Sequence, residues 1–199
     1  MIPFERLEAV AAPLPSPNID TDQIIPARFL QKPRKEGYAD FLFRDLRFDS
    51  NGAPKPDFVL NKPASASARI LVAGRNFGCG SSREGAVYAL WDYGFRSVIA
   101  SSFGDIFYGN SLKNGFLPIV LPQADVDRLM VVLAEFPGAT LAIDLADQSV
   151  TSPTGTIYRF DIDPYVKQCL LRGIDELDYT LSFASEIAAF EARAALAHE

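Results

Sequence analysis

The sequence contains one histidine, His198, which lies next to the C-terminus. Histidine is the commonest general base and metal ligand in proteins. A self-sufficient Ser-His-Asp hydrolase or a zinc enzyme is therefore not expected. Any chemistry must use Ser, Arg, Cys or carboxylate groups, or must borrow groups from another chain.

Cysteine is also scarce, since Cys79 and Cys169 are the two in the sequence. They do not make a disulfide framework, which favours a reducing compartment, and they are too few and too far apart to hold an iron–sulfur cluster on their own. The N-terminus carries Glu5 and Glu8 and lacks the long apolar core of a signal peptide. No run of about eighteen apolar residues is present that could span a membrane. We therefore expect a cytoplasmic protein.

Acidic residues outnumber basic residues, which gives a net charge of −6, and no basic run offsets it. Nucleic acid is therefore not an expected partner. Hydrophobic residues make up 48% and charged residues 22% of the 199 residues, which predicts one globular domain with a core of its own. The sequence has no Gly-Lys pair, so a P-loop is excluded.

The most informative stretch is residues 68–94, ARILVAGRNFGCGSSREGAVYALWDYG. Its beginning predicts a buried strand at Ile70–Val72, and three closely spaced glycines then predict a tight loop. A helix follows, with Ser81 as N-cap and Glu84 completing a capping box. A dinucleotide-binding fingerprint would need a third glycine where Arg83 stands, so nucleotide binding is not expected.

Arg83 falls in the first turn of this predicted helix, where the helix dipole disfavours a cation. The placement becomes favourable if an anion binds there. Backbone N–H groups, the hydroxyls of Ser81 and Ser82 and the guanidinium could then converge on a carboxylate or phosphate. The alternative is an arginine that points to solvent or pairs with a surface acid, and the local sequence leaves both interpretations open.

The rest of the chain predicts an α/β fold. Strands at 97–100 and 116–121 alternate with helices, and this order implies parallel strands with right-handed crossovers. Further expectations are an extended lead-in at Pro13–Pro17, a helix at 124–135, a hairpin formed by 140–145 and 156–162, a helix from Asp163 to Arg172, a strand or loop at Leu177–Phe183, and a last helix at about 184–197.

These residues carry a resemblance to a known family. GRNFGCGSSREGA resembles the active-site loop of the swivelling domain of the aconitase superfamily, and the whole chain is similar to the small subunits of 3-isopropylmalate dehydratases (isopropylmalate isomerases). Three further motifs agree, namely NIDTDQIIPARFL at 18–30, PDFVLNKP at 56–63 and SSFGDIFYGNSLKNGFLP at 101–118. The resemblance implies one swivelling β/β/α-type domain over residues 1–199, with a mostly parallel central sheet, βαβ units, an added C-terminal hairpin and helices.

The resemblance also implies roles for individual residues. Ser81 matches the catalytic base, a serine acting as alkoxide, although its other possible role is only that of a helix cap. Arg83 matches the carboxylate clamp and Ser82 a substrate hydrogen-bond donor. Asp22 matches an acidic position that helps to order the active site. From the residues alone, Asp20 and Asp22 favour a turn held by Asx hydrogen bonds over a cation site, which needs around six oxygens.

The family places its substrate-recognition loop at residues 30–47 of this chain. Arg34 and Lys35 are candidates for the substrate's second carboxylate, and Leu30 and Tyr38 are candidates to face its side chain. The alternative is a solvated, mobile loop with no specific role. The two interpretations are compatible, because recognition loops are often mobile until they close.

The implied reaction converts 2-isopropylmalate to 3-isopropylmalate through 2-isopropylmaleate in leucine biosynthesis, by eliminating and re-adding water. The implied partner is a large subunit that carries a 4Fe–4S cluster as Lewis acid, with no cofactor bound by this chain alone. Two rival interpretations remain. One is the small subunit of a related hydro-lyase for a shorter 2-hydroxy diacid such as 2-methylmalate (citraconate hydration), and the other is a carboxylate-binding domain without catalysis.

One residue departs from the family motif Ser-Ser-Arg-Glu-His-Ala, because Gly85 stands at the histidine position. Either the missing volume enlarges or reshapes the pocket and shifts the substrate preference, or a partner group supplies what the histidine supplied and the substrate is unchanged. Ser81 and Arg83 are both present, so we expect retained chemistry with a somewhat shifted preference.

Overall fold

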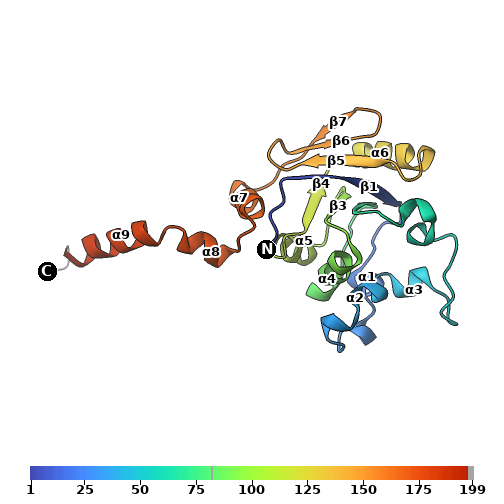
Figure 1. Ribbon diagram of the computed structural model, residues 1–199, viewed down its shortest axis with the longest axis horizontal. Helices are drawn as coiled ribbons and strands as arrows, with labels where there is room; N and C mark the ends of the chain where they lie inside the picture. The colour runs from blue at the N-terminus through green and yellow to red at the C-terminus, as the bar shows by residue number, and fades with distance from the viewer. Residues whose placement is uncertain (82, 197–199) are drawn as a thin grey trace.

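The computed structural model describes residues 1–81 and 83–196. Within them, seven strands form one sheet in the order β4-β3-β2-β1-β5-β6-β7 (Figure 1). The strands are β1 (Arg6–Leu14), β2 (Ile70–Ala73), β3 (Ser97–Ala100), β4 (Leu117–Val120), β5 (Thr140–Asp144), β6 (Ser149–Thr151) and β7 (Ile157–Arg159). The α-helices are α1 (Thr21–Ile24), α2 (Tyr38–Phe41), α3 (Arg44–Arg47), α4 (Glu84–Tyr93), α5 (Asp105–Lys113), α6 (Gln123–Glu135), α7 (Pro164–Arg172), α8 (Glu176–Leu181) and α9 (Ala184–Leu196). Short 3-10 turns are η1 (Ala27–Phe29), η2 (Arg34–Glu36), η3 (Val59–Asn61) and η4 (Pro63–Ser65).

The parallel half of the sheet confirms the predicted βαβ units. Strands β1, β2, β3 and β4 run parallel, and α4 and α5 connect β2 to β3 and β3 to β4. Strand β2 is buried on both faces, which is why its residues are uniformly apolar. Leu71 and Ala73 join a core with α1 and α4, whereas Ile70 and Val72 join a second core with α6. Burying one such aliphatic side chain stabilises the fold by about 1.5–3 kcal/mol.

The expectation that Pro13–Pro17 forms only an extended lead-in is wrong for Pro13, which lies inside the central strand β1. The backbone oxygen of Leu14 accepts a bond from Gly74 N (3.0 Å) on the β2 side, while Ala11 N donates to Ala139 O (3.1 Å) on the opposite side. Pro13 lies two residues after Ala11, so its backbone nitrogen points to the same side of β1. On that side β5 does not extend as far as Pro13, so the missing N–H costs no hydrogen bond of the sheet.

The antiparallel half contains one strand more than the predicted hairpin. Strand β5 pairs with β1 and β6, and β6 pairs with β7. The two predicted strands correspond to β5 and β7, which do not form one hairpin, because β6 lies between them and pairs with both. The missed strand β6 has three residues, and a turn with Gln148 at a φ of 51° precedes it. Such a short segment shows too little alternation to be recognised from the sequence.

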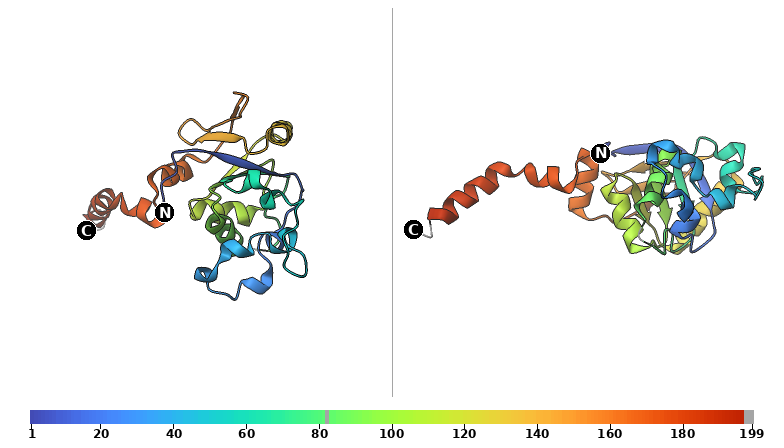
Figure 2. Two further views of the ribbon diagram at one scale, coloured as in Figure 1. Left: turned by 45° about the vertical axis from the view of Figure 1, so that its right-hand side comes forward. Right: turned by 90° about the horizontal axis from the view of Figure 1, so that it is seen from below.

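The C-terminal part forms an arm that projects from the sheet domain (Figures 1 and 2). Asp163 caps α7 as predicted, since its Oδ1 accepts bonds from Tyr165 N (2.9 Å) and Val166 N (3.1 Å). The expected strand or loop at Leu177–Phe183 is instead mostly helix α8, which Asp175 caps by accepting from Asp178 N.

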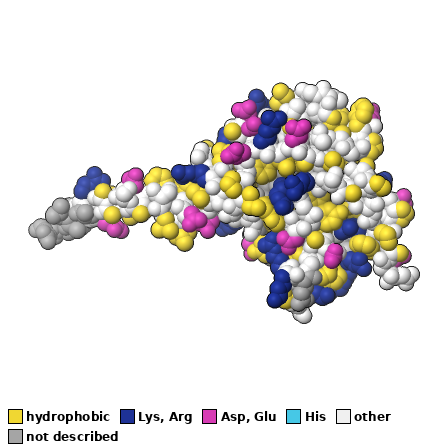
Figure 3. All heavy atoms as spheres, viewed as in Figure 1, with side chains coloured by type: hydrophobic (Ala, Val, Ile, Leu, Met, Phe, Trp, Pro, Cys, Tyr) yellow, Lys and Arg dark blue, Asp and Glu magenta, His cyan; other side chains and the backbone are white. Residues whose placement is uncertain are grey.

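Hydrophobic side chains lie exposed along this arm (Figure 3). They are Leu177, Leu181, Phe183, Ile187 and Phe190. The predicted last helix is α9. In the part of the chain that the structure describes, no helix is both long and apolar enough to cross a membrane.

Candidate functional site

Three loops meet at the carboxyl ends of the parallel strands, which is where α/β sheets commonly bind ligands. The loop after β1 runs beside the loop after β2, because Gly78 N donates to Ile19 O (2.7 Å) and Thr21 N donates to Cys79 O (2.9 Å). The loop after β3 holds the other side, where Gly104 N donates to the oxygen of Phe77 (3.0 Å). The glycine loop after β2 is therefore held between the loops that follow β1 and β3.

Two glycines are required for this close packing. Gly78 has a φ of 71°, and a Cβ there would overlap the ring of Phe107. A Cβ on Gly104 would lie 2.5 Å from the backbone oxygen of Gly78. Real Cβ atoms do not approach backbone that closely, so a side chain at either position would separate the loops.

The predicted capping box at Ser81 is wrong. Helix α4 begins at Glu84, and its N-cap is Arg83, whose backbone is extended (φ −128°, ψ 102°). Ser81 lies before the helix and is exposed, and its backbone oxygen accepts a bond from Thr21 Oγ1 (2.9 Å). This tertiary bond holds the backbone of Ser81 toward the β1 loop. Ser82 lies outside the described residues.

Arg83 forms an ion pair with Asp22, in which guanidinium Nη1 donates to carboxylate Oδ1. The side chain of Arg83 is 20% exposed and that of Asp22 is 51% exposed. The structure thus unites two residues that stand 61 positions apart in the sequence. Asp20 caps α1 by accepting from Gln23 N (2.7 Å), which confirms the predicted Asx-type turn. A guanidinium at a loop edge with one exposed acidic partner can exchange that partner for a substrate carboxylate.

The recognition segment, which is the predicted substrate-recognition loop at residues 30–47, packs against α4 (Figure 1). A Cβ on Gly85 would lie 2.7 Å from Cδ2 of Leu30 and 3.5 Å from Cε2 of Tyr38. Tyr38 is buried, Leu30 is half-buried and Lys35 is exposed. The space that a side chain at Gly85 would fill is therefore occupied by Leu30. This argues against an empty pocket beside Gly85, while a reshaped pocket and replacement of the histidine by a partner group both stay open.

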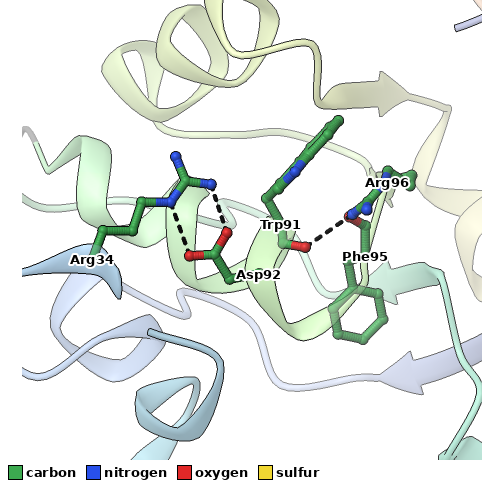
Figure 4. A network of polar contacts seen from close by, with 5 residues as sticks. All are labelled: Arg34, Trp91, Asp92, Phe95 and Arg96. Atoms are coloured by element: carbon green, nitrogen blue, oxygen red, sulfur yellow. Dashed lines mark hydrogen bonds and ion pairs between the residues drawn. The ribbon is translucent and has the colours of Figure 1, made fainter. Parts of the chain in front are cut away.

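Arg34 binds Asp92, near the last turn of α4 (Figure 4). Its Nε donates to Oδ2 (2.9 Å) and its Nη2 to Oδ1 (2.6 Å), and its guanidinium lies 4.2 Å from the ring centre of Tyr88. Asp92 raises the pKa of Arg34 above its ordinary value, mainly through this hydrogen bond. Burial raises the pKa of Tyr88, and a hydrogen bond with Glu84 adds to the effect. The assignment of Arg34 to a substrate carboxylate stays a prediction.

Sequence reasoning missed Asp92 and Tyr88. The one available signal is their spacing from Gly85, since residues 85, 88 and 92 share one face of a helix. Figure 4 also shows a second group, in which Arg96 stacks on Trp91 (3.9 Å) and donates to its backbone oxygen (2.9 Å). That group belongs to the end of α4.

The donor set of this chain does not fit an iron–sulfur cluster. A 4Fe–4S cluster takes four thiolates as a rule, and the sequence has two cysteines. Cys79 is half-exposed in the glycine loop, and Cys169 is buried on α7. Across residues 1–81 and 83–196, no group of three or more His, Cys, Asp or Glu side chains is placed to hold a metal ion.

Comparisons with known proteins agree on one family. A family model described as the aconitase C-terminal domain matches residues 1–124, and one described as LeuD_N matches residues 127–164. The 3-isopropylmalate dehydratase small subunit of Phenylobacterium zucineum is 53% identical over 194 residues, covering 98% of this chain and 95% of the relative. That of Parvibaculum lavamentivorans is 52% identical over 188 residues, covering 94% of each. A crystal structure of 3-isopropylmalate dehydratase (leuD) from Methanocaldococcus jannaschii is similar with a TM-score of 0.65 and 26% identity, over 94% of this chain and 99% of that chain.

Proposed function

This chain belongs to the family of 3-isopropylmalate dehydratase small subunits, and from this premise we propose that it serves a heteromeric hydro-lyase of leucine biosynthesis. The enzyme converts 2-isopropylmalate to 3-isopropylmalate by removing and re-adding water. The observation that carries the proposal is the arrangement of an exposed serine, Ser81, with the Arg83–Asp22 ion pair at the carboxyl edge of the parallel sheet.

A large subunit is the proposed partner, and it is proposed to carry the 4Fe–4S cluster. The thiols of Cys79 and Cys169 are too few for that role. The small dicarboxylate substrate binds between the two subunits, so this chain supplies one wall of the site. A reducing cytoplasmic location is part of the proposal, and it agrees with the free state of both cysteines.

Within this wall, Ser81 is the proposed base. Its oxygen, as alkoxide, takes the proton from the substrate carbon next to the one that bears the hydroxyl, and the hydroxyl leaves as hydroxide to give 2-isopropylmaleate. In the re-addition, hydroxide adds to the carbon that lost the proton, and Ser81 delivers a proton to the carbon that lost the hydroxyl. A serine hydroxyl is a weak base unless its anion is stabilised. The positive charge of Arg83, two residues away, supplies that stabilisation at the edge of the site.

Arg83 is also the proposed carboxylate clamp. Its planar guanidinium can bind both oxygens of a substrate carboxylate once Asp22 gives way. Asp22 orders the guanidinium until then, because a neighbouring carboxylate limits where the long side chain points. Ser82 is proposed to donate a further hydrogen bond, while Leu30, Tyr38 and Lys35 belong to the recognition segment.

Among the residues that the structure describes, no feature favours either of the two rival functions. A shifted substrate preference was argued from the volume missing at Gly85, and Cδ2 of Leu30 lies 2.7 Å from where a Cβ would be. A carboxylate-binding domain without catalysis is not favoured, because Ser81, Arg83 and Asp22 are all present. Isopropylmalate therefore remains the proposed substrate.

The test is reconstitution. The purified chain is mixed with a cluster-bearing large subunit of a 3-isopropylmalate dehydratase, and turnover of 2-isopropylmalate and 2-methylmalate is measured. We expect isomerisation of 2-isopropylmalate with the higher kcat/KM. A complex that acts only on 2-methylmalate would support the first rival, and a complex that forms but turns over neither substrate would support the second.

A further inference from the structure

One face of α4 carries three residues that meet the recognition segment. Gly85, Tyr88 and Asp92 follow the i, i+3, i+7 spacing that brings helix residues onto one side. The seven-residue span corresponds to about 10 Å along the helix axis. Leu30 approaches Gly85 at one end of this face, and Arg34 reaches Asp92 at the other.

The contacts at the two ends are of different kinds. At the Gly85 end, the methyl of Leu30 occupies the place of a side chain, so the contact depends on having no Cβ there. At the Asp92 end, a two-point ion pair is stacked on the ring of Tyr88. Surface ion pairs contribute little as a rule, but two-point Arg–carboxylate geometry with aromatic stacking is the favourable exception.

The ion pair with Asp92 neutralises the charge of Arg34. Both of its bonded nitrogens point at the carboxylate of Asp92, at the end of α4 away from Arg83 (Figure 4). Lys35 is exposed. The two neighbouring cations of the segment are therefore in different situations, since Arg34 is bound to α4 through Asp92 and Lys35 faces solvent.

We propose that Asp92 and Tyr88 are positioning residues, and that they act through Arg34 to hold the recognition segment along α4. This role rests on the proposed function, because the segment matters only if it meets the substrate. Arg34 is then an anchor, and Lys35 is the cation that faces the second carboxylate. Asp92 sets where Lys35 and Leu30 stand without touching the substrate itself.

The test compares Asp92→Asn with a matched control, Asp125→Asn. Asp92 and Asp125 are each 25% exposed, and each pairs with an arginine, Asp125 with Arg128 (2.8 Å) on α6 away from the segment. Trypsin cleavage after Lys35 in the chain alone reports how often the segment leaves α4. KM and kcat for 2-isopropylmalate in the complex with the large subunit report its effect on the substrate.

In Asp92→Asn we expect cleavage to accelerate and KM to rise, each by about fivefold, the size of one favourable surface ion pair. We expect kcat to stay within about twofold, and Asp125→Asn to match wild type in all three. The double variant Arg34→Asp with Asp92→Arg should bring the cleavage rate and KM back toward wild type, because the ion pair can still form with the two charges exchanged.

Two results would overturn the anchor. In the first, Asp92→Asn is cleaved no faster than Asp125→Asn. In the second, the exchanged pair recovers resistance to trypsin while KM stays high, which would make Arg34 itself a substrate ligand. If the wild-type complex does not act on 2-isopropylmalate, the proposed function fails, and the trypsin comparison still decides whether Asp92 holds the segment.

Discussion

Cδ2 of Leu30 lies 2.7 Å from the position that a Cβ on residue 85 would take, where the chain has Gly85. The glycine that departs from the family motif is thus matched by a residue of the recognition segment. Leu30 ends in a flexible methyl, so a side chain at position 85 would displace that methyl either by a rotamer change or by a shift of the segment. This relationship links the helix that follows the catalytic loop to the segment that faces the substrate.

We first predict that Gly85→Ala stabilises the chain less than Gly109→Ala. Both glycines are helical, and alanine is favoured in a helix by about 0.8–1.0 kcal/mol. A Cβ on Gly109 in α5 meets nothing within 4 Å, whereas one on Gly85 meets Leu30. We expect the full gain at Gly109 and a gain near zero at Gly85, measured as the free energy of unfolding in urea. Equal gains would show that Leu30 moves at no cost.

We also predict that Gly85→His shifts substrate preference. The imidazole needs the space of Leu30, so the apolar wall of the segment must move. The ratio of kcat/KM for 2-isopropylmalate to that for 2-methylmalate should change by roughly threefold or more, as expected when a small apolar contact is altered. An unchanged ratio would mean that Gly85 does not set specificity and that a partner group replaces the histidine.

Arg83→Lys should impair turnover severely while the fold survives. Lysine keeps the charge but loses the planar two-point fit to a carboxylate, and we expect kcat/KM to fall by about a hundredfold, or about 2.7 kcal/mol. Stability should change by less than about 1 kcal/mol, because lysine keeps the charge and the carboxylate of Asp22 is half-exposed. Arg128→Lys on α6 is the control. Near-normal rates in Arg83→Lys would show that Arg83 is not the clamp.

Ser81→Ala should leave stability nearly unchanged. Ser81 does not cap α4, so its hydroxyl should be worth less than about 0.5 kcal/mol. Asp163→Ala is the contrast, because Asp163 accepts two backbone bonds at the start of α7 and its loss should cost about 1 kcal/mol. Thermal unfolding of both variants measures the difference. A comparable loss in Ser81→Ala would return that residue to a structural role.

The chain purified alone should be colourless and inactive, since two cysteines cannot hold a four-iron cluster. Visible absorption spectra before and after anaerobic addition of iron and sulfide provide the measurement. An iron-dependent absorption band from the single chain would contradict the assignment of the cluster to the partner.

Much of the fold was predictable because it depends on local pattern. The buried strands around Leu71 and Ile99 are short apolar runs, and such runs are typical of strands in a parallel sheet. The expectation for Pro13 was wrong because β1 tolerates a proline where the proline nitrogen faces no paired strand. Which side each backbone N–H of β1 faces depends on pairing with residues far along the chain.

The motif indicated Ser81 and Arg83 as site residues, and their roles stay predictions. Nothing in the sequence indicates that Thr21 donates to the carbonyl of Ser81, which lies before the helix. Asp92 was missed for the same reason. Its partner Arg34 lies 58 positions away, and their pairing exists only once the segment lies along α4.

The most direct test of the account is solvent proton exchange in the reconstituted complex. 2-Isopropylmalate is incubated in D2O with the large subunit and either wild-type chain or Ser81→Ala, and deuterium at the carbon next to the hydroxyl-bearing one is measured by mass spectrometry. We expect deuterium in the recovered substrate and in 3-isopropylmalate with the wild type, and in neither with Ser81→Ala. Persistent exchange with Ser81→Ala, or no isomerisation by the wild type, would contradict it.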